Sequence, residues 1–72
     1  MTRAEHLAWA KRRALEYVDA GELANGVASM ISDLKKHPEL EDHAGIMLGT
    51  MYLAGGMMRT LEEVRKWIEG FN

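Results

Sequence analysis

The chain contains no cysteine. A disulfide therefore cannot stabilise it, and a metal site made of thiolates is excluded. With 72 residues it is near the lower size limit of chains that fold alone. Its stability must come from apolar packing, which association with a second molecule can complete. The lack of cysteine also agrees with a reducing compartment, and we expect one domain, residues 1–72, in the cytoplasm.

The chain also has no large excess of one charge and no long apolar run. Nine basic and eleven acidic side chains leave a net charge of −2, which is too weak for a nucleic-acid footprint. The longest run without a charged residue, residues 44–58, contains four glycines. As a helix it would extend about 22 Å, whereas a bilayer core is roughly 30 Å thick. The amino terminus also lacks a signal-peptide layout, so we expect no membrane segment.

Proline occurs once, at Pro38, and divides the chain into two pairs of helical segments. The first helix is predicted to begin at a capping box of Thr2 and Glu5 and to end at Gly21. The second is predicted over residues 22–36. Apolar residues at helical spacing mark the predicted core faces: Ala4, Leu7, Ala8, Ala14, Leu15 and Val18, then Leu23, Val27, Met30, Ile31 and Leu34.

After the proline, a third helix is predicted over residues 43–54, with Asp42 as its N-cap. A fourth begins at a second capping box, Thr60 with Glu63, and stops at Gly70. Its predicted core face is Leu61, Val64 and Ile68. The third helix is apolar nearly all round, through Ile46, Met47, Leu48, Met51, Tyr52 and Leu53. Such a helix is either buried centrally or covered by a partner.

The chain nearly repeats itself after 35 residues. Three pairs of similar residues carry the repeat: Ala14 and Gly49, Tyr17 and Tyr52, Gly21 and Gly56. A small residue at the first position lets a neighbouring helix approach closely, and Gly26 in the second helix suits the same approach from the first. Periods in the thirties are typical of helix-turn-helix repeats. We therefore predict an all-α fold of four short helices in two antiparallel hairpins.

The glycine and proline spacing is similar to that of tetratricopeptide repeats. The resemblance rests on Gly21, Gly26, Val27 and Pro38, followed by Leu48, Gly49, Tyr52 and Gly56. It implies that the hairpins form a tetratricopeptide-like small bundle. Asp33 stands where that family prefers a small residue. Two ordinary helical hairpins are the alternative.

Taken whole, the chain resembles short accessory proteins of bacteriophages that infect actinobacteria. Residues 9–21, 27–30, 33–39 and 65–72 carry this resemblance. It implies a small intracellular phage product that acts on a host protein, and it brings no catalytic role with it.

Basic residues offer one candidate site. Lys11, Arg12 and Arg13 are consecutive, and Lys35 and Lys36 lie at the end of the predicted second helix. These five residues are candidate phosphate contacts for a nucleic-acid-associated regulator. Three consecutive helical residues, however, spread over about 200° of the helix circumference, so a solvated face is the competing interpretation.

Histidines offer a second candidate. His37, Glu41 and His43 lie close in sequence, and a metal ion could be imagined between them. The competing interpretation is a solvated acidic connection over residues 39–43, because no histidine pair has the i, i+4 spacing of a helical metal site. No other spacing suggests catalysis, so we expect no enzymatic activity, no cofactor and no metal.

Methionines offer the third candidate, which we favour. Met47, Met51, Met57 and Met58 crowd the apolar third helix and the turn after it. Methionine fills irregular cores and also lines adaptable binding surfaces, and the sequence leaves both roles open. We predict a protein-interaction module that self-associates or binds a host protein. Its predicted contact residues are these four methionines, with Trp67 and Phe71 as aromatic anchors.

Overall fold

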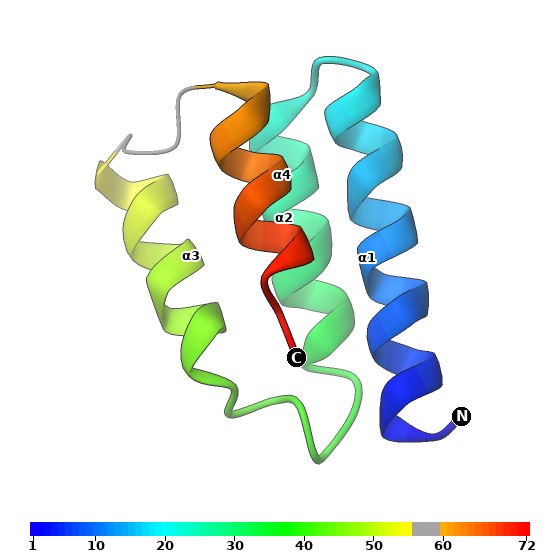
Figure 1. The fold of residues 1–72 in the computed structure, drawn as a ribbon. Coiled ribbons are helices and arrows are strands. Elements are labelled where there is room, and N and C mark those ends of the chain that lie inside the picture. The colour runs from blue at the N-terminus through cyan, green and yellow to red at the C-terminus, as the bar shows by residue number, and fades with distance from the viewer. Residues whose placement is uncertain (56–59) are drawn as a thin grey trace.

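Four helices make up the fold in the computed structural model, which describes residues 1–55 and 60–72. They are α1 (Arg3–Asp19), α2 (Leu23–Leu34), α3 (Ala44–Gly55) and α4 (Leu61–Glu69). The helices run alternately up and down, with α2 and α4 in the middle and α1 and α3 on opposite sides (Figure 1). The described residues contain no strand. The predicted all-α fold with four helices is confirmed.

The start and end of α1 follow the local sequence. The Thr2 hydroxyl accepts a hydrogen bond from the Glu5 amide at 3.1 Å, and the Glu5 carboxylate accepts one from the Thr2 amide at 3.0 Å. The hydrogen bond from the Thr2 amide to the carboxylate is the main cause that lowers the pKa of Glu5 below its ordinary value of 4.5. At the other end, Gly21 has a φ of 80°, which only glycine adopts without strain. Both predicted boundary signals are confirmed.

The core lies between all four helices. Its buried apolar residues are Leu7, Ala10, Ala14, Val18, Val27, Met30, Leu34, Leu40, Ile46, Val64, Ile68 and Phe71. On α1 the predicted face is wrong at Ala4 and Ala8, which are exposed, while His6 and Ala10 are buried. The buried line runs through His6, Ala10, Ala14 and Val18 at i, i+4 spacing. Alanine has a single methyl group, so it says little about which side of a helix is covered.

A glycine brings α1 and α2 together. A Cβ atom on Gly26 would lie 3.0 Å from Cγ2 of Val18 and 3.2 Å from the carbonyl oxygen of Ala14. The predicted close approach at Gly26 is therefore confirmed. The buried Ala14 lies on the facing side of the same crossing, which is the role expected for the small residue of the repeat.

The connection between α2 and α3 is more structured than the sequence suggests. Leu40 lies within the predicted acidic connection, yet its side chain is fully buried. Its amide donates to the carbonyl of His37 at 3.0 Å, and its carbonyl accepts from the amide of His43 at 3.0 Å. These tight turns place His43 immediately before α3. The prediction of Asp42 as the N-cap is wrong, because Nδ1 of His43 accepts from the Gly45 amide instead, at 3.0 Å.

The carboxyl end of the chain is tied to α1. At the start of α4, the Thr60 hydroxyl accepts from the Glu63 amide at 3.1 Å, and the helix ends directly before Gly70 as predicted. Beyond it, Nζ of Lys11 donates to the carbonyl of Phe71 at 2.5 Å. Arg3 donates to the carbonyl of Asn72 at 2.8 Å. The two chain ends therefore lie near one another (Figure 1).

Across the bundle, Arg65 on α4 donates to Asp19 at the end of α1, with an N–O distance of 2.5 Å. This hydrogen bond raises the pKa of Arg65 above its ordinary value. The C-terminal helix therefore packs on both α1 and α2. None of the described helices combines the length and the apolar character needed to cross a bilayer.

Candidate protein-binding face

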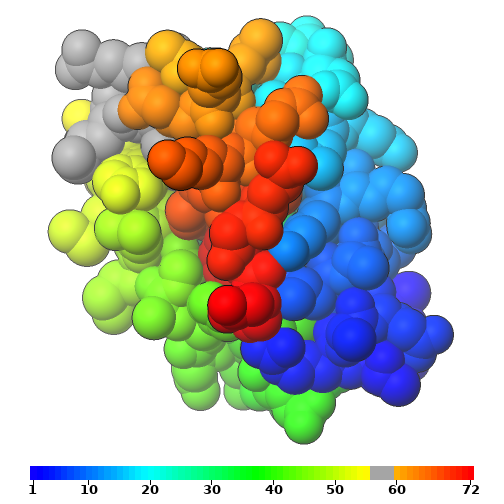
Figure 2. Space-filling view, viewed as in Figure 1, coloured from blue at the N-terminus to red at the C-terminus, as the bar shows by residue number. Residues whose placement is uncertain are grey.

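The most apolar helix of the chain lies at the edge of the bundle. No charged residue occurs in α3, yet only Ile46 and Gly49 of its 12 residues are buried. Figure 2 shows its green and yellow atoms along one rim of the molecule. Among the described residues its neighbours are α2 and α4, and its far side meets no other helix (Figure 1). Of the two alternatives that the sequence left open for this helix, central burial within the chain is therefore excluded, and the helix is left largely uncovered.

Two glycines attach α3 to the rest of the protein. A Cβ atom on Gly49 would lie 2.9 Å from Cη2 of Trp67, and one on Gly45 would lie 2.6 Å from Cε1 of Phe71. The indole nitrogen of Trp67 also donates to the carbonyl of Gly45 at 3.2 Å. The two aromatic rings meet edge to face, with centroids 5.0 Å apart. Gly49 thus admits a close neighbour, as the repeat predicts.

This packing corrects the predicted roles of the two aromatic residues. Phe71 is only 4% exposed and belongs to the core, so it cannot serve as an accessible anchor for a partner. Trp67 is half-buried against Gly49. Its ring is used mainly to hold α3 in place. The sequence signal for this contact was the pair of glycines four residues apart on a helix that otherwise carries large apolar side chains.

The predicted methionines on α3 are exposed. Met47 is 70% exposed, Met51 60% and Leu48 43%. Met57 and Met58 lie outside the described residues. Met47, Leu48 and Met51 form one continuous apolar surface together with exposed small residues at the two helix ends. This surface is here named the α3 face, and its residues are Ala44, Met47, Leu48, Met51, Ala54 and Gly55. Their spacing of i, i+3, i+4, i+7, i+10 and i+11 puts them on one side of the helix.

The α3 face has the properties of a contact surface for another protein. It contains no charged or hydrogen-bonding side chain. Its largest members are unbranched methionines, whose flexible thioethers adapt to an irregular partner. Single exposed apolar residues are ordinary on protein surfaces, whereas a continuous apolar strip along a helix makes the α3 face the candidate binding surface of this chain.

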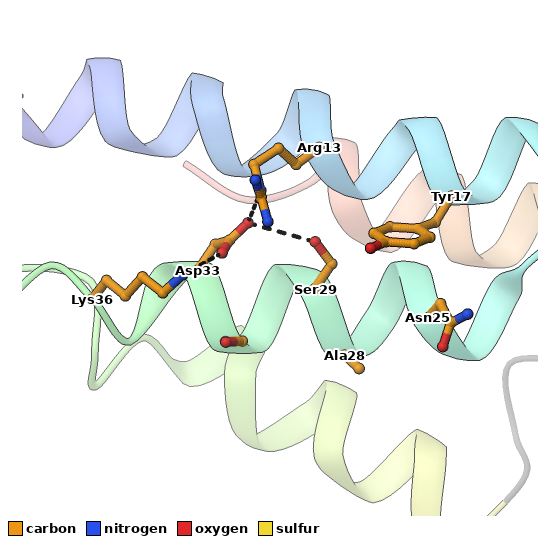
Figure 3. Close-up of a pocket in the computed structure, with 8 residues that line it drawn as sticks. Arg13, Tyr17, Asn25, Ala28, Ser29, Asp33 and Lys36 are labelled. Atoms are coloured by element: carbon orange, nitrogen blue, oxygen red, sulfur yellow. Dashed lines mark hydrogen bonds and ion pairs between the residues drawn. The ribbon is translucent and has the colours of Figure 1, made fainter.

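The basic candidates are largely used within the fold. Asp33 is 2% exposed, and its carboxylate is bound by Arg13 at 2.7 Å and by Lys36 at 3.1 Å (Figure 3). Ser29 lies 3.5 Å from the same carboxylate. Lys11 is held at the chain end, and Arg12 and Lys35 are exposed. The five residues therefore do not form one free basic patch.

The Asp33 cluster borders a groove of about 370 Å³ between α1 and α2. Tyr17, Asn25 and Ser32 also line it. No histidine is among the residues that line this groove. Sequence reasoning missed Asp33 as a buried residue. The available signal was its place on the same helical side as Met30 and Leu34.

The histidines lie in two separate places. Nε2 of His6 donates to the carbonyl of Asp33 at 2.6 Å, and its ring centroid lies 5.2 Å from that of His37. The ring of His43 instead packs against Phe71, with centroids 4.8 Å apart. In the described part of the chain, no group of three His, Cys, Asp or Glu side chains could hold a metal ion. The imagined set of His37, Glu41 and His43 is not brought together.

Comparisons with protein-family models, with curated proteins and with solved structures gave no match.

Proposed function

We propose that this protein is a small non-catalytic protein-interaction module that binds its partner through the α3 face. One observation carries the proposal: Met47 and Met51 are 70% and 60% exposed in the middle of an uncharged helix. Burial of an apolar side chain stabilises a complex in proportion to the area removed from water. A partner that covers these methionines gains this free energy without having to desolvate a charge.

The resemblance to phage accessory proteins and to tetratricopeptide-like hairpins extends this proposal. A phage product of this kind would act in the host cytoplasm, and its partner would be a host protein or a further copy of itself. Both occupants use the same chemistry, which is burial of the α3 face against an apolar surface.

The proposal can be tested by capture on immobilised protein. Wild type, Met51→Asp and Ala8→Asp are compared, each incubated with actinobacterial lysate to which a labelled copy of the chain has been added. Ala8 is exposed on α1, so its substitution adds the same charge away from the α3 face. We expect a protein that wild type and Ala8→Asp retain about tenfold more strongly than Met51→Asp does, since loss of about 1.4 kcal/mol weakens binding tenfold.

Circular dichroism shows whether the two variants remain helical. If both are folded and Met51→Asp retains the same proteins as wild type, the α3 face is not the binding surface. If wild type retains no protein above the bare support, the proposed function is wrong.

The nucleic-acid alternative stays a prediction that no observation favours. Lys11, Arg13 and Lys36 make intramolecular contacts, and binding of phosphates would have to compete with Asp33. Gel retardation of duplex DNA at low salt tests it, because phosphate contacts are strongest there.

A further inference from the structure

The α3 face contains a seam suited to another helix. The seam consists of four exposed residues at intervals of three, four and three: Ala44, Met47, Met51 and Ala54. This spacing is that of helices that pack side by side at a small crossing angle. Leu48 and Gly55 continue the surface along one side of the seam. The seam therefore favours a helix as its occupant over an extended strand or a small molecule.

The chemistry of the seam matches a second copy of itself. A surface with charges of one sign repels its own copy, whereas the α3 face carries no charge along its 12 residues. A symmetric pair places the same patch on both partners, which requires a patch that is complementary to itself. The net charge of −2 per chain lies outside this face. We propose that the α3 face binds the α3 face of a second copy, with the two helices antiparallel.

The residues around α3 decide the direction of the pair. Glu39, Glu41 and Asp42 are exposed in the connection that leads into α3. In a parallel pair, each of these carboxylates would lie beside its own copy. In an antiparallel pair they lie at opposite ends of helices about 18 Å long. That separation exceeds the screening length of about 8 Å at physiological salt, so the repulsion between these particular carboxylates is largely removed.

The size of the face sets the expected affinity. A single helix of 12 residues covers less area than the roughly 800 Å² per partner of a standard interface. Such small interfaces are weak, and we expect a dissociation constant of about 10 µM. This inference rests on the proposed function and names the partner that occupies its surface.

The first test measures mass in solution. Sedimentation equilibrium of the full chain from about 1 to 500 µM spans the expected dissociation constant. Wild type and Ala8→Glu should rise from 8.1 kDa to twice that mass over this range. Met51→Glu should stay at 8.1 kDa while keeping its helical content, because a carboxylate would be buried in the seam. If Met51→Glu associates like wild type, or Ala8→Glu loses association equally, the proposed pair is wrong.

The second test uses the absence of native cysteine, which makes single introduced thiols unambiguous. A disulfide requires Cα atoms within about 7 Å. In the antiparallel pair, Ala44 of one copy lies near Ala54 of the other. A mixture of Ala44→Cys and Ala54→Cys should therefore cross-link under mild oxidation. Ala44→Cys alone should not. Cross-linking of Ala44→Cys alone at the same rate would indicate a parallel pair and would overturn the antiparallel arrangement.

These results separate the occupant from the proposed function. If wild type remains at 8.1 kDa at 500 µM, a second copy is not the occupant. The broader function then survives only if the capture experiment finds another protein whose binding is weakened by Met51→Asp. If that experiment also retains nothing, both proposals fail together.

Discussion

Two helices of equal length are buried to very different extents in this fold. Both α2 and α3 contain 12 residues. The polar and apolar residues of α2 are segregated, and five of its residues are buried, including the charged Asp33. The more uniformly apolar α3 buries only two. Apolar character alone therefore does not place a helix in the core.

The difference follows from the surfaces available to each helix. One side of α2 is covered by α1, α3 and α4, so its apolar residues and its one charged residue are enclosed together. The only flat side of α3 is the one with Gly45 and Gly49, where the aromatic rings of Trp67 and Phe71 fit. In the described part of the chain no helix packs on the far side of α3, so its apolar residues there stay exposed.

The largest test of this comparison exchanges one methionine in each helix for alanine. Met30 in α2 is fully buried, and Met30→Ala should lower the free energy of unfolding by about 2–5 kcal/mol. Met51 in α3 is 60% exposed, and Met51→Ala should change the free energy of unfolding by less than about 0.5 kcal/mol. Urea denaturation at concentrations below self-association measures both. Equal losses would mean that α3 is covered within a single chain.

A second test asks what the buried charge of α2 contributes. Asp33→Asn removes the charge that Arg13 and Lys36 share, and we expect a loss of about 1–3 kcal/mol in unfolding free energy. The two cationic side chains are about half exposed, so water can solvate them once Asp33 is neutral. Asp42→Asn, in the exposed connection, is the matched control and should have almost no effect. A neutral result for both would show that packing alone joins α1 to α2.

A third test concerns how α3 is attached. Gly49→Ala places a methyl group against the ring of Trp67, and overpacking of this kind costs about 1–3 kcal/mol. The gain in helix propensity, about 1 kcal/mol, offsets part of that loss. In a Trp67→Leu background, the same change should be neutral or stabilising, because the contact is gone. Thermal denaturation of the four forms of this cycle measures the coupling. Strict additivity would contradict the packing of Trp67 on Gly49.

The smallest expected effect concerns the ends of helices. The Thr2 and Glu5 capping box starts α1, whereas neither α2 nor α3 has such a box. The lowered pKa of Glu5 means that its carboxylate stabilises the folded state above about pH 4.5, and that this contribution is lost as the pH falls through the lower folded value. The protection of the first-turn amides of α1, taken as their exchange relative to the intrinsic rate at each pH, should fall as the pH is lowered through this range. It should change less in Glu5→Gln. Identical pH profiles of wild type and Glu5→Gln would rule out the capping box as the cause of the change in exchange.

The local sequence determined where the helices begin and end. Thr2, Gly21, Thr60 and Gly70 act through the backbone of their own neighbours, and such short-range effects need no tertiary structure. The face of α2 was also predictable, because its large apolar residues recur at helical spacing. In α1 the alanines gave little information about direction, so Ala4 and Ala8 were assigned to the core in error.

Only the tertiary structure decided which apolar surface was covered. The exposure of Met47 and Met51, the burial of Phe71 and the enclosure of Asp33 each depend on contacts between residues far apart in the sequence. The sequence singled out Met47 and Met51, which are exposed, but it did not reveal that Phe71 is buried. Helical periodicity can identify an apolar side, but whether that side faces a core or the solvent depends on the other elements that pack against it.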